Sequence, residues 1–183
     1  MGVLAKIVSL LSAVNSAVLA VGRQIAWVAL VLMVFIILIQ VFMRYALNNA
    51  LPWPEEAARA LMIWMMAFMA PSGYRWGAFV SINMVVDSMP SPARRALVLA
   101  IFILASVILF VLLQHSTKHF NSGFIFRSSS LKIPLAYIYL AMTVCFGLMM
   151  SVNIEMILRT LGRTFGKEED FPKPETPSFM SGG

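Results

Sequence analysis

The sequence predicts an all-α integral membrane protein with four transmembrane helices and short amphipathic segments at the membrane interface. Hydrophobic residues make up 60% of the chain and charged residues 12%, with a mean hydropathy of +0.84. Soluble domains are nearer half apolar and a quarter charged. Four apolar stretches also reach the length needed to cross a bilayer, where only helices or closed barrels satisfy the backbone. Continuous runs of this length indicate helices.

The four predicted spans share a membrane-crossing length of about 30 Å as helices. Arg59 lies near the start of the second span and Pro71 near its end, whereas the other three spans carry no charge. Pro134 opens the fourth span, at a position where a helix tolerates proline. Together they form one membrane domain over residues 24–165. The predicted spans are residues 24–43, 57–74, 96–114 and 133–152.

Two further segments predict helices that lie in the interface rather than cross the membrane. Residues 77–89 place apolar side chains on one helical face and polar ones on the other, and Pro90 ends the segment. Residues 1–23 carry a polar stripe, from Lys6 to Arg23, opposite an apolar one. The alternative for this second segment is a cleaved signal peptide, against which the polar stripe argues.

The distribution of basic residues predicts the orientation. Of the 14 Lys and Arg residues, nine lie in the N-terminal segment, the second-to-third connection and the C-terminal tail. Because cytoplasmic flanks carry the excess, both termini are expected to be cytoplasmic. These flanks account for the net charge of +6, so no nucleic-acid partner is implied. Residues 166–183 are polar and rich in proline, which predicts a disordered cytoplasmic tail.

The sequence offers little for metal or enzyme chemistry. His115 and His119 have a spacing that can place two imidazoles on one metal, but no further His completes a site and Cys145 is the only cysteine. We therefore interpret the two histidines as interfacial polar residues. No phosphate-binding, metalloprotease or nucleophile motif is present, so neither an enzyme nor a cofactor is expected.

An autonomous four-helix transporter or channel is the alternative function. A proton-coupled carrier needs an ionisable group deep in a helix. Glu155 lies at the cytoplasmic end of the fourth span, four residues before Arg159, a spacing suited to a surface pair. No buried carboxylate is therefore expected, and the chain alone is poorly equipped to pump a solute.

The stretch "RYALNNALPWPEEAARALMIW" places charge between the first two apolar runs. Arg44 ends the first span and Trp53 is an interfacial aromatic anchor. Glu55 and Glu56 occupy the first turn of the second helix, where carboxylates complement the helix dipole. Arg59 lies four residues after Glu55 and three after Glu56, so it can pair with one or both. The pattern indicates a helix entrance with a compensated charge cluster.

The same stretch resembles the small membrane subunit of the tripartite ATP-independent periplasmic (TRAP) transporters. The resemblance lies in the order Arg-Tyr, an Asn-containing turn, Trp-x-Glu-Glu-x-x-Arg and a second Trp, and "SSLKIPLAYIYLAM" is similar to the Ile-Pro start of the family's last helix. It covers about residues 40–150. The chain departs from the family pattern at Phe79 and Asn83, where a His and an acidic residue are frequent, and at Thr143, where a Pro is common.

The resemblance implies an accessory role in a bacterial inner membrane. In this family a periplasmic binding protein captures an organic acid, and a large membrane subunit imports it with sodium ions. The small subunit would scaffold the large one among membrane lipids and help to dock the binding protein. The candidate subunit-interface or docking residues are Arg44, Trp53, Glu55, Glu56, Arg59 and Trp64.

Overall fold

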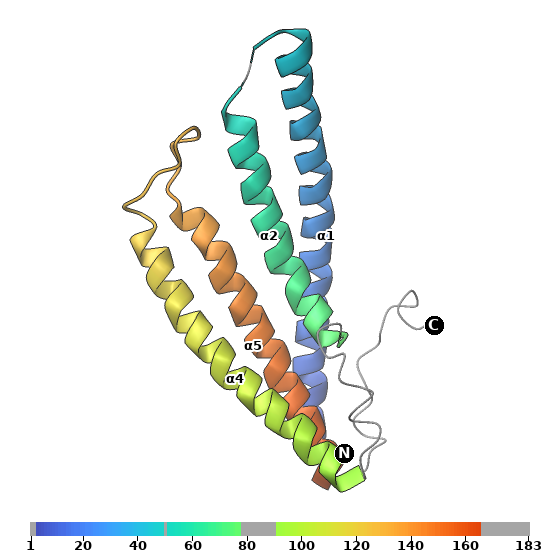
Figure 1. Cartoon of the computed structure of the whole chain (residues 1–183). Coiled ribbons are helices and arrows are strands. Elements are labelled where there is room, and N and C mark those ends of the chain that lie inside the picture. The colour runs from blue at the N-terminus through green and yellow to red at the C-terminus, as the bar shows by residue number, and fades with distance from the viewer. Residues whose placement is uncertain (1–2, 50, 78–90, 166–183) are drawn as a thin grey trace.

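The computed structural model describes residues 3–49, 51–77 and 91–165, which form four helices (Figure 1). They are α1 (Val3–Ala46), α2 (Trp53–Arg75), α4 (Ser91–Ser122) and α5 (Ala136–Phe165). The predicted all-α class is confirmed. Except for Gly77, the predicted interfacial helix over residues 77–89 lies outside the described residues, as does the predicted tail over residues 166–183.

α1 is one continuous helix of 44 residues, which corresponds to about 66 Å. We expected a separate amphipathic helix before residue 24, but the structure shows no break there. The middle of the polar stripe explains the difference, because Ser12 and Ser16 are bonded by side chains of other helices, whereas Lys6 and Ser9 stay exposed. Asn15, which adjoins the stripe beside Ser16, is only 5% exposed. The helix therefore continues straight through the predicted boundary.

The helices form an open layer. α1 packs against α2, α2 against α5, and α5 against α4, while α1 also touches α5. Figure 1 shows the helices converging toward the N-terminal end of α1 and spreading apart at the opposite end. Polar contacts that bind several helices together therefore concentrate at the converging end.

Small residues let α1 approach α2 closely. Ala26 and Ala29 of α1 are 3% and 8% exposed. A Cβ atom added at Gly22 would lie 3.3 Å from the ring of Phe68 on α2. Gly22 and Ala26 form a small-xxx-small pair, a spacing that brings membrane helices into backbone proximity.

Three of the described helices are long and apolar enough to cross a membrane, namely within Ala5–Ala46, Ala96–Ser122 and Ala136–Arg163. The most apolar windows of these helices are only 11%, 6% and 22% buried within the chain. Their outward faces are therefore left for lipid or for another protein. α2 is less apolar, because its first turns carry Glu55, Glu56 and Arg59.

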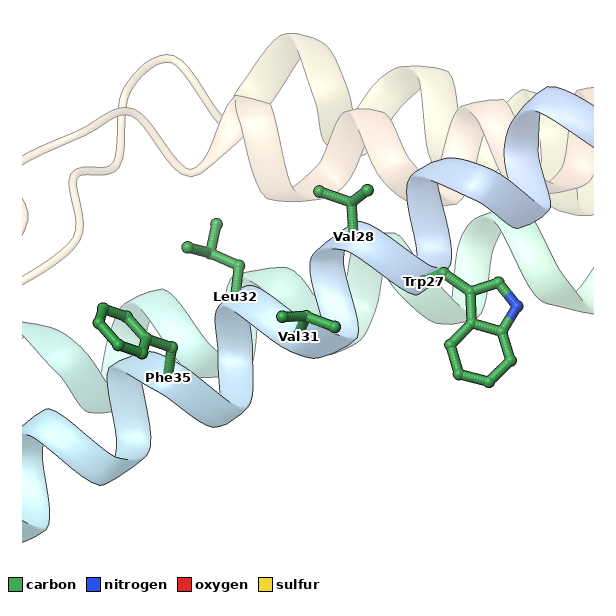
Figure 2. A pocket seen from close by; sticks show the side chains of 5 residues that line it. All are labelled: Trp27, Val28, Val31, Leu32 and Phe35. Carbon is green, nitrogen blue, oxygen red and sulfur yellow. The ribbon is translucent and has the colours of Figure 1, made fainter.

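The surface of α1 carries a shallow hollow on its outward face. Figure 2 shows that Trp27, Val28, Val31, Leu32 and Phe35, all from α1, line it. Because a single helix supplies every lining residue, this is a groove in an apolar surface and not a chamber between helices. Among the five lining side chains, the indole Nε1 of Trp27 is the only polar atom.

Candidate functional site

A buried carboxylate joins three helices where the layer converges. Glu155 of α5 is 0% exposed. Its Oε1 atom accepts a hydrogen bond from Nη2 of Arg75 on α2 at 3.0 Å and one from Nε of Arg159 at 3.0 Å. Its Oε2 atom accepts a hydrogen bond from Nδ2 of Asn15 on α1 at 2.7 Å. One side chain therefore holds α1, α2 and α5 together.

The two arginines extend this network onto α1. Nη1 of Arg75 donates to Oγ of Ser16 at 2.7 Å, and Nη2 donates to Oγ of Ser12 at 3.0 Å. Nη2 of Arg159 also donates to Oγ of Ser12, at 2.6 Å. Ser12 and Ser16 of α1 thus accept hydrogen bonds from the guanidinium groups of α2 and α5, which explains why this half of α1 packs on those helices.

A second branch reaches α4. The hydroxyl of Tyr74 on α2 donates to Oδ1 of Asn153 on α5 at 2.6 Å. Nδ2 of Asn153 donates to the carbonyl of Phe102 at 3.0 Å and to Oγ of Ser106 at 2.6 Å, both on α4. Because Asn153 is 0% exposed, these bonds are made away from solvent. The two clusters adjoin along the chain at Tyr74 and Arg75, and together their bonds connect all four described helices.

Two expectations about Glu155 were wrong. The spacing to Arg159 predicted a surface pair and the sequence suggested no buried carboxylate, but this pair lies inside the layer. The signal that could have revealed it is a match between two polar stripes. On α1, Asn15 and Ser16 follow Ser12 by three and four residues, and on α5, Ser151, Glu155 and Arg159 are each four residues apart. Polar stripes on two apolar helices satisfy each other best by facing one another.

The buried ion pairs of Glu155 hold the helices in a fixed arrangement. A carboxylate facing two guanidinium groups is favoured in its charged form. Removing one partner of a buried ion pair is strongly destabilising, because the remaining charge stays buried without compensation. Because both of its carboxylate oxygens are engaged by side chains of α1, α2 and α5, Glu155 is suited to holding these helices in place.

At the opposite end of the layer, the predicted pairing of Arg59 is confirmed for Glu55. Nη2 of Arg59 lies 3.0 Å from Oε1 of Glu55. The two side chains are 65% and 70% exposed, and pairs this exposed contribute less than about 1 kcal/mol. The pair therefore presents charge on the surface and adds little stability.

Glu56 turns the other way, toward the α4–α5 connection. Its carboxylate accepts hydrogen bonds from the hydroxyls of Ser128 and Ser129 and from the N–H groups of Ser130 and Leu131. The Ser128 hydroxyl, followed by the Leu131 N–H, contributes most to lowering the pKa of Glu56 to about 2. Glu56 thereby fastens the first turn of α2 to the connection, a contact that the sequence did not predict.

The remaining candidate residues do not join this pair. Trp53 begins α2 and is 38% exposed. The guanidinium of Arg44 lies 6.0 Å from the ring centroid of Tyr45. The ring of Trp64 stacks on Phe68 with centroids 5.6 Å apart, on the part of α2 that packs against α1. The structure brings together only Glu55 and Arg59 of the predicted set.

Comparisons with known proteins identify a matching family and a similar protein. The family model described as "Tripartite ATP-independent periplasmic transporters, DctQ component" matches residues 33–163. The chain is similar to the "Ectoine TRAP transporter small permease protein TeaB" of Halomonas elongata, with 28% identity over 144 residues, covering 75% of this chain and 70% of that protein. The family match includes Glu55, Glu56 and Arg59, here called the outer corner after the predicted orientation. It also includes Glu155 with both of its arginines, whereas Ser12 and Asn15 precede it.

Proposed function

The chain belongs to the DctQ component of the TRAP transporters, and on that premise we propose that this multi-pass small subunit scaffolds a large membrane subunit and helps to dock a periplasmic binding protein. The transporter would take up an organic acid with sodium ions across the bacterial inner membrane. Both termini would be cytoplasmic and α2 would cross the membrane with the other three helices. The chain itself would be neither an enzyme nor a carrier.

The observation that carries the scaffold proposal is that both carboxylate oxygens of Glu155 accept hydrogen bonds from other side chains. Among the described residues it is the only buried Asp or Glu. A coupled carrier needs an ionisable group that can change its state during transport. Glu155 instead lies 3.0 Å from Arg75 of α2 and 2.9 Å from Arg159, which follows it on α5. A layer fixed in this way supports a static role.

The open arrangement supports a membrane partner. At most 22% of the most apolar window in any of the three long apolar helices is buried within the chain. Their remaining apolar surface suits lipid on one side and the transmembrane part of a large subunit on the other. The groove of Figure 2 belongs to this unburied surface.

The outer corner supports the docking part of the proposal. Glu55 and Arg59 are exposed at the end of the layer that the basic flanks assign to the periplasm. The carboxylate of Glu56 is hydrogen-bonded to the α4–α5 connection, so it orders that connection and is not available to a partner. Exposed charges of this kind steer a soluble partner and set its orientation more than they add affinity.

Reconstitution tests the proposal. Liposomes would contain this chain alone, the large subunit alone, or both. In each case the binding protein loaded with its organic acid and a sodium gradient across the membrane would be supplied. We expect co-purification of the two membrane subunits and uptake only when both are present. Sodium-driven uptake by this chain alone would refute the scaffold role and favour an autonomous transporter. Failure of the two subunits to co-purify in mild detergent would contradict the proposed assembly.

A further inference from the structure

The connection from α4 to α5 exposes three consecutive large apolar side chains. Phe124, Ile125 and Phe126, here called the apolar patch, are 54%, 79% and 57% exposed. Figure 1 shows the chain turning outward at the end of α4, away from α1 and α2, before it arches back to α5. Apolar surface left in water is unfavourable, so the patch requires a covering partner.

The patch is held by an ordered hairpin over residues 123–135. The N–H of Leu135 donates to the carbonyl of Phe126 at 3.0 Å, and the N–H of Ser128 donates to the carbonyl of Ile133 at 2.9 Å. Glu56 fastens the tip through the N–H groups of Ser130 and Leu131 at 3.0 Å each. These bonds order the hairpin and leave each side chain of the patch more than half exposed, with Phe124 also in edge-to-face contact with Phe120 of α4 at 5.2 Å between ring centroids.

The hairpin is also basic. Lys118, Arg127 and Lys132 are exposed on it or beside it. The sequence contains no Asp or Glu between Ser91 and Ile154. Within the described residues none of these three cations forms a salt bridge, and the oxygens of Glu56 are occupied by the hairpin itself. The surface therefore combines apolar side chains with uncompensated positive charge.

The patch adjoins helices whose surfaces already suit lipid. α4 exposes apolar side chains along its length, and only 6% of its most apolar window is buried. Examples on its last apolar turns are Ile108, Val111 and Leu112, which are 51%, 46% and 39% exposed. The polar turns over residues 114–122 separate this apolar run from the patch. On the other strand of the hairpin, Phe126 accepts a hydrogen bond from Leu135, so the patch lies beside the start of the fourth predicted span, which begins at residue 133.

We propose that the hairpin is an anchor for anionic phospholipid. The apolar patch inserts at the boundary between headgroups and acyl chains, and Arg127 and Lys132 contact the lipid phosphates. Apolar side chains beside cations are the combination that interfacial membrane segments use. The proposal goes beyond the subunit role, and it holds whichever face of the membrane the hairpin occupies.

Spin-label accessibility tests the insertion. The full chain with Cys145→Ala would carry Ile125→Cys or, as a matched aqueous position, Asn49→Cys, which is exposed in the α1–α2 turn. Each would be placed in nanodiscs of phosphatidylcholine with phosphatidylglycerol, alone and with the large subunit. We expect collisions with oxygen relative to a water-soluble nickel complex to be several-fold higher at position 125 than at position 49. Equal ratios, or shielding of position 125 from both reagents by the large subunit, would overturn the proposal.

A second comparison tests whether Arg127 and Lys132 favour insertion beside anionic lipid. Adding phosphatidylglycerol to phosphatidylcholine nanodiscs should raise the oxygen-to-nickel ratio at position 125. The increase should disappear in the Arg127→Gln, Lys132→Gln variant, because both cations are exposed and their loss leaves the hairpin's hydrogen bonds intact. The same increase in the variant and the parent would show that these cations do not select anionic lipid, and the proposal would fail.

Discussion

The guanidinium of Arg75 lies 3.0 Å from Oε1 of Glu155 and joins α2 to α5 inside the helix layer. Arg75 also donates to Ser12 and Ser16, so it holds α1 at the same point. A chain with few buried side chains therefore obtains much of its helix order from one charged cluster. This relationship supports the first prediction.

Glu155→Gln should destabilise the protein strongly. The substitution leaves Arg75 and Arg159 without their counter-charge, and breaking a buried pair typically costs about 3–5 kcal/mol. Thermal unfolding in detergent would measure the loss. Glu55→Gln is the matched control, because its pair is 65% and 70% exposed and should change stability by less than about 1 kcal/mol. Similar unfolding temperatures for the two variants would contradict a stabilising role of the Glu155 ion pairs.

Gly123→Ala should disturb the turn between α4 and α5. An added Cβ would lie 2.7 Å from both N and Cα of Ala136, and this backbone cannot move aside cheaply. We expect a loss of about 1–3 kcal/mol, the range for overpacking. Gly147→Ala is the control, since nothing lies within 4 Å of its added Cβ and alanine favours the helix. Equal stability of both variants in chemical unfolding would count against the close packing.

Glu56 should make the α2–hairpin contact sensitive to acid. Its pKa falls from an ordinary 4.5 to about 2 in the folded chain, so the stabilisation is fully present above about pH 4.5 and is lost as pH falls through about 2. Amide hydrogen exchange at Ser130 and Leu131, corrected for intrinsic rates, would follow the contact. We expect protection to fall steadily below about pH 4.5 in the parent.

In Glu56→Gln the same two amides should be less protected at neutral pH, and the acid transition should disappear, because glutamine has no carboxylate to protonate. Exchange at α5 amides far from the hairpin provides the internal reference. An unchanged acid transition in Glu56→Gln would assign it to a different group.

The features that the sequence predicted depend on neighbours along one helix. Hydropathy located all four helices, and the four-residue spacing of Glu55 and Arg59 predicted their pair. The Glu56 contacts join residues 72–75 positions apart, and Asn15 meets Glu155 across 140 positions. Such contacts depend on how helices are arranged in space. Polar side chains at compatible spacing on two helices suggest a contact, but they do not identify which helices will be adjacent.

The orientation is testable at Asn49, in the exposed turn after α1. The distribution of basic residues predicts that this turn faces the periplasm. In a Cys145→Ala background, Asn49→Cys should react with a membrane-impermeant maleimide added to intact spheroplasts. Lys6→Cys, at the opposite end of α1, should react only after the membrane is opened. The reverse labelling pattern would invert the proposed topology and remove the docking role from the outer corner.

The exposed pair offers the sharpest test of docking. Glu55→Gln with Arg59→Gln removes two surface charges, and Glu56 remains to hold the hairpin. Because the pair contributes little to stability, assembly with the large subunit should stay normal. If these charges steer the binding protein, uptake should require several-fold more loaded binding protein to reach half its maximal rate, and the difference should shrink at high salt. Lys6→Gln, on the expected cytoplasmic side, controls for a general effect of charge. A normal concentration dependence in the double variant would leave Glu55 and Arg59 as a helix-surface pair and locate docking elsewhere.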